Sequence, residues 1–394
     1  MSTLTLLEER SRRTPDAKAL YAPGRKPLSY ATLHAHAVRT AVGLRQRRIN
    51  RNDTVAIVLP NGPEMATAFL SVSAAAICAP LNPAYRADEL EFYLSDLSAR
   101  ALIIAGLPET PARDVARRLE IPVIELAWSA EDPAGLFSLD GLPASEPGTS
   151  FQGPRDSDVA LVLHTSGTTS RPKIVPLTHG NLSASARHVA ATLQLISEDR
   201  CLNVMPLFHI HGLVAALLAS LEAGGSVVCA AGFIAPSFFD WMADFRPTWY
   251  TAVPTMHASI VARAPANRTT IDSHSLRFIR SSSSALPRTT LVQLEEIFGV
   301  PVVEAYGMTE AAHQMASNPL PPGVRKPGTV GRAAGPAISV LNSEGQPAPA
   351  GVRGEVAIKG PNVTAGYASN PGANAAAFIN GWLRTGDEGI LDED

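Results

Sequence analysis

Short apolar runs alternate with segments of helical periodicity along most of the chain. The apolar runs are typical of strands buried on both faces of a parallel sheet, and the segments between them are typical of covering helices. In the first part of the chain the pattern predicts strands at residues 54–60, 101–105 and 121–125 and helices at residues 29–48, 63–78, 87–97 and 111–119. This alternation favours an α/β fold built on a doubly wound parallel sheet.

The same alternation resumes after a Pro/Gly/Ser-rich stretch at residues 142–154, which is typical of a connector. The further predicted strands cover residues 201–207, 225–229, 247–254, 276–280 and 300–304, and the further predicted helices cover residues 179–195, 212–221, 237–244, 255–263 and 287–298. After residue 326 glycine and proline become dense, and short alternating runs predict a small β-rich subdomain. We therefore expect three units, at residues 1–155, 156–326 and 327–394.

Composition and charge exclude several classes of protein. The 394 residues carry a formal net charge of −3, whereas a nucleic-acid-binding protein would carry a basic surplus. The longest apolar stretch, residues 213–221, is too short to cross a bilayer, and residues 1–13 lack the apolar region of a secretory signal. The three cysteines are far apart in apolar surroundings, which predicts core thiols of a cytoplasmic protein and no zinc site. Scarce lysine beside abundant arginine suggests a bacterial source.

One polar loop concentrates groups that bind phosphate. The sequence HTSGTTSRPK at residues 164–173 follows an apolar strand-like run and supplies hydroxyls, free backbone N–H groups and the cation Lys173. Such groups can hold a phosphate chain. The loop is not a Walker A motif, because Gly167 stands alone and Ile174 follows the lysine. A plain surface loop of the same composition remains the alternative.

Two later motifs bring further nucleotide-binding chemistry. In VVEAYGMTE, residues 302–310, a buried strand is expected to run into a turn, where Tyr306 could stack on a base, Thr309 could donate to a phosphate and Glu310 could hold Mg²⁺. In GWLRTGD, residues 381–387, Asp387 ends an extended run and could accept hydrogen bonds from ribose hydroxyls. Each motif alone could also be an ordinary strand end.

Taken together and in this order, the three motifs resemble those of the adenylate-forming superfamily of acyl-CoA synthetases, luciferases and peptide-synthetase adenylation domains. The resemblance runs from about residue 3 to the last residue. It implies two stacked, doubly wound, mostly parallel sheets with helices and a small β-rich subdomain. It also implies ATP, Mg²⁺ and coenzyme A as reactants and an acyl-AMP intermediate. Ser170 and Ile174 stand where the family usually has glycine, which puts the mobility of the phosphate loop in question.

The resemblance also implies residue roles. Lys173, Thr309 and Glu310 would be catalytic, and Glu310 would hold Mg²⁺. The segment SSSSALP at residues 281–287 would lie against the adenine. The residues expected to bind ATP or AMP are Thr165, Ser166, Gly167, Thr168, Thr169, Ser170, Lys173, Ser283, Ser284, Ala285, Glu304, Ala305, Tyr306, Gly307, Met308, Thr309 and Asp387.

The family also uses a lysine on a C-terminal lid. The lysines of this sequence are Lys18, Lys26, Lys173, Lys326 and Lys359, and none of them falls in such a lid. We therefore expect the chain as given to lack the lid domain, to bind nucleotide, to adenylate poorly and to fail in the thiol step.

Several segments are most similar to the oxalyl-CoA synthetase branch of the superfamily, among them PLFHIHG at residues 206–212 and LRFIRSSSS at residues 276–284. A second carboxylate in the acyl site would be costly to bury unless donors met it. His211, Ser283 and His313 are the candidate donors. His313 falls three residues after Glu310, so on a following helical turn it would face the same site.

The partners expected are therefore a small carboxylate, ATP and coenzyme A, with no nucleic acid and no membrane span. A ligase for oxalate or another small dicarboxylate is the first interpretation. A short- or medium-chain fatty acyl-CoA ligase is the second, with the same fold and nucleotide chemistry but a different pocket; in an apolar pocket hexanoate would gain about 3 kcal/mol from buried CH₂ groups. The third is an adenylation module that loads a carrier protein, and the fourth is a non-enzymatic nucleotide-binding protein.

Overall fold

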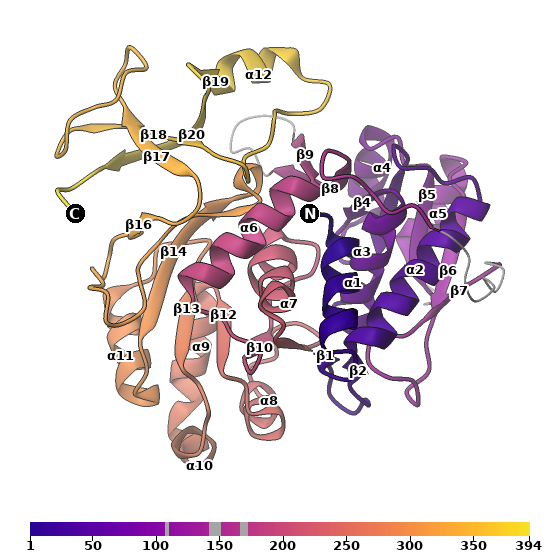
Figure 1. The fold of residues 1–394 in the computed structure, drawn as a ribbon, viewed down its shortest axis with the longest axis horizontal. Coiled ribbons are helices and arrows are strands. Elements are labelled where there is room, and N and C mark those ends of the chain that lie inside the picture. Colours follow the sequence, from indigo (N-terminus) through magenta and orange to yellow (C-terminus); the bar gives the residue numbers. More distant parts are fainter. Residues whose placement is uncertain (107–109, 142–150, 166–171) are drawn as a thin grey trace.

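The computed structural model describes residues 1–106, 110–141, 151–165 and 172–394. Two α/β lobes lie side by side, and a bundle of helices that includes α1, α3 and α6 runs between them (Figure 1). A small sheet near the C-terminus sits at one end of the second lobe (Figure 1). The arrangement confirms the α/β class with two mostly parallel sheets and a β-rich subdomain.

The first lobe contains a seven-stranded sheet in the order β7-β6-β5-β3-β4-β8-β9. Its strands from β6 to β8 are parallel, and β7 and β9 close the two edges in antiparallel orientation. The central strands are almost wholly apolar and buried, as parallel strands covered on both faces must be. The bounds are β3 Thr54–Val58, β4 Ile77–Pro80, β5 Ala101–Ala105, β6 Val123–Ala127, β7 Ser138–Leu139, β8 Val159–Thr165 and β9 Lys173–Thr178.

The second lobe contains a nine-stranded sheet in the order β16-β15-β14-β13-β12-β10-β11-β1-β2. The strands from β1 to β14 in this order are parallel, and β2, β15 and β16 are antiparallel. The bounds are β1 Lys18–Tyr21, β2 Leu28–Ser29, β10 Arg200–Asn203, β11 Ser226–Cys229, β12 Trp249–Ala252, β13 Phe278–Ser281, β14 Val302–Met308, β15 His313–Ser317 and β16 Arg332–Ala333.

The two sheets exchange segments of the chain. Strands β1 and β2, near the N-terminus, complete the second sheet, whereas β8 and β9, which follow residue 155, complete the first. The phosphate-loop candidate therefore connects two strands of the first sheet. The divisions at residues 155 and 326 stay a prediction.

Helices form largely where periodicity predicts them. The side chain of Ser29 accepts a hydrogen bond from the amide of Thr32 and caps α2, which shows why that helix begins there. The expected helix at residues 63–78 is too long, because α3 ends at Ala75 and the rest of the apolar run forms β4. The helices of the two lobes are α1 Thr3–Arg13, α2 Tyr30–Gln46, α3 Pro63–Ala75, α4 Ala87–Asp96, α5 Pro111–Arg118, α6 His179–Thr192, the π-helix η1 His211–Leu218, α7 Ala219–Ala223, α8 Phe238–Phe245, α9 Pro254–Arg263, the 3₁₀ turn η2 Ala264–Asn267, α10 Arg268–Asp272, α11 Arg288–Phe298 and the 3₁₀ turn η3 Thr309–Ala311.

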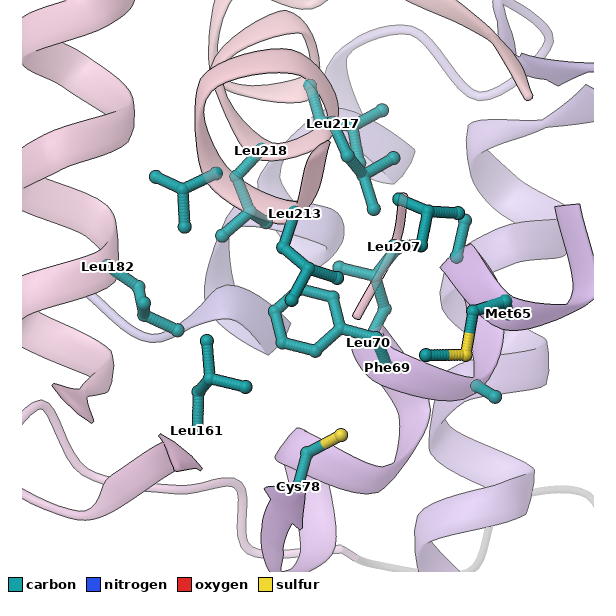
Figure 2. Close-up of a cluster of buried hydrophobic side chains, with 14 of the residues drawn as sticks. Met65, Phe69, Leu70, Cys78, Leu161, Leu182, Leu207, Leu213, Leu217 and Leu218 are labelled. Atoms are coloured by element: carbon teal, nitrogen blue, oxygen red, sulfur yellow. The ribbon is translucent and has the colours of Figure 1, made fainter. Parts of the chain in front are cut away.

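The largest core cluster joins the two lobes. Figure 2 shows side chains of α3, including Phe69 and Leu70, packed against Leu213 and Leu217 of η1 and Leu182 of α6. All five are fully buried. This shared apolar core fixes the helices of one lobe against those of the other, and so it fixes the first sheet relative to the second.

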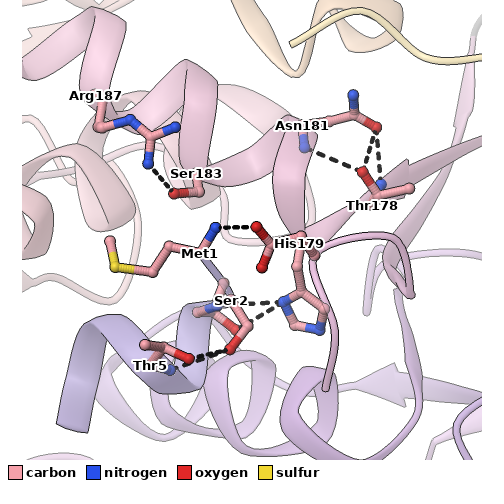
Figure 3. A network of polar contacts seen from close by, with 10 residues as sticks. Met1, Ser2, Thr5, Thr178, His179, Asn181, Ser183 and Arg187 are labelled. Carbon is pink, nitrogen blue, oxygen red and sulfur yellow. Dashed lines mark hydrogen bonds and ion pairs between the residues drawn. The ribbon is translucent and has the colours of Figure 1, made fainter. Parts of the chain in front are cut away.

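The N-terminus is anchored to the start of α6 by polar contacts (Figure 3). The amino group of Met1 pairs with Asp156 at 2.5 Å, and the amide of Thr3 donates to His179 Nδ1 at 3.3 Å. The other ring nitrogen of His179 donates to the carbonyl of Ser73 at 3.0 Å. Burial lowers the pKa of His179 to about 4, so the ring is neutral at pH 7.

The small antiparallel sheet has the order β17-β18-β20-β19. Its strands are β17 Ala337–Leu341, β18 Arg353–Lys359, β19 Phe378–Ile379 and β20 Trp382–Ile390, and α12 Pro371–Ala377 accompanies them. The side-chain amide of Asn181, on α6, donates to the carbonyls of Pro361 and Val363, which ties this subdomain to the helix after the phosphate loop.

Two further sequence predictions can be compared with the structure. Cys78, Cys201 and Cys229 are free and buried, as expected of core thiols. Of the helices in the described part of the chain, none combines the length and apolarity needed to cross a membrane.

Candidate functional site

A cavity of about 1120 Å³ opens at the carboxyl ends of β13 and β14, where ligands of open α/β sheets bind. It lies between these strand ends and the C-terminal sheet, so residues distant in sequence meet in it. The motif residues that line it are Ser283, Ser284, Ala285, Glu304, Ala305, Tyr306, Gly307 and Asp387.

The hydroxyl of Tyr306 donates to Asp387 across this cavity, which joins β14 to β20. Burial raises the pKa of Tyr306, so its hydroxyl stays protonated and acts as a donor. Glu304, on the same strand, accepts from the amide of Gly328 at 3.0 Å, and burial raises its pKa. An aromatic ring and an acidic side chain thus face one cavity, as base stacking and ribose recognition require.

Some sequence-based expectations about these motifs are wrong in local structure. Tyr306 and Gly307 lie within β14 rather than on a turn after it, and Asp387 lies inside β20. His313 is the first residue of β15 and not part of a helical turn. The reason is a tight return of the chain: η3 separates β14 from β15, and the two strands then pair in antiparallel orientation.

A second group links the base of the phosphate loop to Glu310. Lys173 pairs with Thr165 across β8 and β9, and its Nζ lies 4.3 Å from the centre of the Tyr367 ring. The Tyr367 hydroxyl donates to Glu310 Oε1 at 2.9 Å. Glu310 is only 5% exposed. The expected catalytic residues Lys173 and Glu310 therefore stand on either side of one tyrosine.

Met308 and Thr309 are not part of the cavity lining given above. Met308 packs against the small apolar cluster beneath the C-terminal sheet, and Thr309 begins η3. Ser166, Gly167, Thr168, Thr169 and Ser170 lie outside the described residues, so the expectations about them stay predictions.

The residues present are sufficient to bind Mg²⁺ when a nucleotide supplies further ligands. No cluster of three or more His, Cys, Asp or Glu side chains that could hold a metal occurs in the described ranges. Mg²⁺ at phosphoryl-transfer sites needs only one or two protein carboxylates, because the substrate phosphates and water supply the other ligands. The single carboxylate of Glu310 meets that requirement.

Beside the cavity lies a polar cluster, which we call the acyl cluster: the buried residues His211, Thr251, Arg280, His313 and Gln314, and the exposed Ser283. His211 Nδ1 lies 3.0 Å from Ser283 Oγ and Nε2 lies 2.6 Å from Thr251 Oγ1. Ser283, which has a positive φ of 72°, also lines the cavity, so it belongs both to the cavity wall and to this cluster.

Arg280 is the centre of the acyl cluster and is fully buried. One terminal nitrogen lies 3.3 Å from His211 Nε2 and 3.3 Å from Thr251 Oγ1. The other lies 3.5 Å from His313 Nδ1 and 3.3 Å from Gln314 Oε1, and Nε has no hydrogen-bond partner among the described residues.

The acyl cluster contains one buried positive charge and, among the described residues, no negative charge that pairs with it. Burial lowers the pKa of Arg280 to about 10, so the group stays charged at pH 7. Burial lowers the pKa of His211 and of His313 well below the ordinary value, so both rings are neutral. No carboxylate of the described residues pairs with Arg280. A buried charge of this kind is stable only with a partner.

The sequence analysis named His211, Ser283 and His313, which the structure brings together, but it did not name Arg280, Thr251, Gln314 or Tyr367. One signal for Arg280 was present: it follows Phe278 and Ile279 in an apolar segment that predicts a buried strand, where an arginine is rare unless it is paired. No comparable signal marks Tyr367, because its position between Lys173 and Glu310 depends on long-range folding.

Comparison with known proteins shows the family to which this chain belongs. The model of the AMP-binding enzyme family matches residues 7–368. The chain belongs to the AMP-binding enzyme family.

This AMP-binding enzyme is 45% identical over 395 residues to an oxalate–CoA ligase of Arabidopsis thaliana, with 99% of this chain and 76% of that protein covered. It is 42% identical over 370 residues to an oxalate–CoA ligase of Saccharomyces cerevisiae, with 87% of this chain and 67% of that protein covered. The crystal structure of ATP-bound MatB from Rhodopseudomonas palustris matches with a TM-score of 0.88 at 29% identity, covering all of this chain and 77% of that one.

Proposed function

We propose that this AMP-binding enzyme is an ATP-dependent ligase that joins a small dicarboxylate, oxalate first, to coenzyme A through an acyl-AMP intermediate. The observation that carries the proposal is the acyl cluster, a buried cation and a set of donors without an anion, next to the cavity lined by the nucleotide motifs. The names of the two relatives support the same substrate.

The nucleotide would occupy the cavity at the ends of β13 and β14. Tyr306 would stack on the adenine, Asp387 would accept hydrogen bonds from the ribose, and the backbone of residues 283–285 would lie along the base. Lys173 and the loop that precedes it would hold the β- and γ-phosphates. When bound beside Glu310, Mg²⁺ supplies charge neutralisation at the phosphates.

The substrate carboxylate needs no general base, because it is already ionised at neutral pH. One of its oxygens attacks the α-phosphorus, the bond to pyrophosphate breaks, and acyl-AMP forms. In the second reaction the thiol of coenzyme A attacks the acyl carbon and AMP leaves. The protein's contribution to the first step is to position the two reactants and to neutralise charge.

The acyl cluster disfavours a fatty acid. A hydrocarbon chain of six carbons would gain about 3 kcal/mol from burial in an apolar pocket. In this cluster it would instead leave a guanidinium and several donors without water and without an acceptor, at a cost of several kcal/mol.

The free, buried cysteines support a reducing compartment, and we place the protein in the cytoplasm on that ground.

The test is a calorimetric titration of the chain, with Mg²⁺ present, by two stable acyl-adenylate mimics that differ only in the acyl part, oxalyl or hexanoyl. Binding is measured rather than turnover, because the mimics need no lid domain to bind and the expectation of poor adenylation stays a prediction. AMP alone is the reference for the nucleotide contribution. Tighter binding of the oxalyl mimic supports the proposal, and tighter binding of the hexanoyl mimic refutes it in favour of a fatty acyl-CoA ligase.

A further inference from the structure

The acyl cluster contains two neutral histidines, and the hydrogen bonds around each ring decide which nitrogen carries the proton. This matters for the substrate because a carboxylate only accepts hydrogen bonds. An acyl site for a dicarboxylate must therefore present N–H or O–H groups and not lone pairs.

Arg280 can only donate, because a guanidinium has no acceptor. Its terminal nitrogen lies 3.3 Å from Nε2 of His211, so that ring nitrogen must be the acceptor. The neutral ring of His211 then carries its proton on Nδ1, which lies 3.0 Å from Ser283 Oγ. Since Ser283 Oγ accepts this bond, its own hydroxyl proton is free to point elsewhere.

The contacts of Thr251 agree with this assignment but do not decide it, because a hydroxyl oxygen can accept two hydrogen bonds. Thr251 Oγ1 accepts from the guanidinium at 3.3 Å, so its hydroxyl proton is available for Nε2 of His211 at 2.6 Å. In the opposite tautomer, His211 would carry its proton on Nε2, and that N–H would point at an N–H of Arg280. This tautomer would also make Ser283 donate to His211 and present lone pairs to the acyl site.

His313 is arranged in the same way but with its nitrogens exchanged. Its Nδ1 faces the other terminal nitrogen of Arg280 at 3.5 Å and accepts, so the proton lies on Nε2. No described residue hydrogen-bonds that Nε2. The ring centroids of His211 and His313 lie 4.9 Å apart, so both rings belong to the same cluster.

We propose that Arg280 is a positioning residue that fixes the tautomers of His211 and His313, so that Ser283 and His313 each have a hydrogen-bond donor available for the second carboxylate of the substrate. This inference rests on the proposed function, because it assumes a dicarboxylate in the acyl site. The buried positive charge of Arg280 adds attraction for the same group.

The first measurement is made on the unmodified chain. In ¹⁵N-histidine-labelled protein at pH 7, the proposal expects an Nδ1-protonated neutral ring for His211 and an Nε2-protonated neutral ring for His313. The signals are assigned with His211→Gln and His313→Gln. An Nε2-protonated His211, or an Nδ1-protonated His313, overturns the proposal without reference to any substrate.

The second measurement compares oxalate with oxamate, in which an amide of similar size replaces one carboxylate. Both are titrated calorimetrically in the presence of Mg²⁺ and a non-hydrolysable ATP analogue. For Arg280→Met, the preference for oxalate is expected to fall about 10- to 100-fold, as when charge-assisted donors are lost. Affinity for the ATP analogue alone is measured in the same variants, so that any loss of nucleotide binding through Ser283 is separated from the loss of the preference for oxalate.

Arg280→Lys is the matched control, since it keeps the charge but replaces the fixed fork of donors with one flexible ammonium. We expect it to lose most of the preference and to alter the signals of His211. Full preference for oxalate in Arg280→Lys or Arg280→Met overturns the positioning role. A wild-type chain that does not prefer oxalate to oxamate refutes the proposed function instead, while the tautomers of the unmodified chain still test the hydrogen-bond network.

Discussion

Gly307 allows β14 and β15 to approach closely, and Gly307→Ala tests this directly. A Cβ atom at Gly307 would lie 2.0 Å from the carbonyl oxygen of His313, 2.7 Å from its carbonyl carbon and 3.2 Å from its Nδ1. The pairing of β14 with β15 also shifts register between Tyr306 and Gly307. The glycine of this motif is therefore required by space across the strand pair.

The magnitude follows from these distances. Real Cβ contacts are almost never shorter than 3.0 Å, and the two nearest atoms met here are backbone atoms that cannot rotate away. The two strands must separate locally by about 1 Å, which in a packed interior costs about 1–3 kcal/mol or more. Because His313 Nδ1 already lies 3.5 Å from Arg280, the same movement should also break that contact.

The assay compares urea unfolding of wild type, Gly307→Ala and the control Gly372→Ala. Gly372 lies in α12 with open space around its Cβ position, so alanine there should be neutral or should stabilise by up to about 1 kcal/mol. We expect Gly307→Ala to unfold at clearly lower urea and to lose the preference for oxalate over oxamate. If Gly307→Ala unfolds at the wild-type midpoint and keeps the preference, the close-packing argument is wrong.

Three other outcomes follow from the site and the buried histidines. Tyr306→Ala should weaken AMP binding, measured by calorimetry, by about 1–3 kcal/mol, the value of one base stacked on an aromatic ring, and an unchanged affinity would remove the ring from the adenine site. Glu310→Gln should abolish the strengthening of ATP binding by Mg²⁺, so that titrations with Mg²⁺ and with EDTA agree; a retained difference would place the metal elsewhere. Burial lowers the pKa of His36, His179 and His257 to about 4, so the unfolded chain binds more protons than the folded chain below pH 6.5. The free energy of unfolding should therefore fall by up to about 1.4 kcal/mol per pH unit for each histidine between pH 6.5 and 4. A thermal midpoint that stays level from pH 7 to pH 5 would contradict this.

Local pattern predicted most of the strands and helices because each buried strand is an apolar run with a helix after it. It failed at residues 76–78, which were assigned to the helix, because helix and strand share one apolar composition there and α3 ends only at Ala76, which is in extended conformation. It also could not predict which sheet a strand joins. Strand β1 pairs with β11, more than 200 residues later, and such pairing depends on the packing of the helices between the sheets.

The candidate site shows the same division between local and long-range information. Tyr306 and Asp387 could be found because each stands in a short motif, but their hydrogen bond across the cavity could not. His313 was found through the wrong local structure: a helical turn was expected, and a strand brings the ring to His211 instead. Arg280 was missed because its role depends on four side chains from three other elements.

The assembly of the acyl cluster from distant segments explains how such a site could discriminate between acids. Arg280 comes from β13, His211 from η1 and His313 from β15, so each donor is fixed by a different rigid element. A flexible site could turn its donors toward water or toward one another when a hydrocarbon chain entered. Here the packed elements prevent that, so a monocarboxylate would leave buried donors unpaired. Buried donors left unpaired discriminate between two acids by far more than a missing CH₂ group does. Under the proposed function, this is why the site accepts a small dianion as its substrate class.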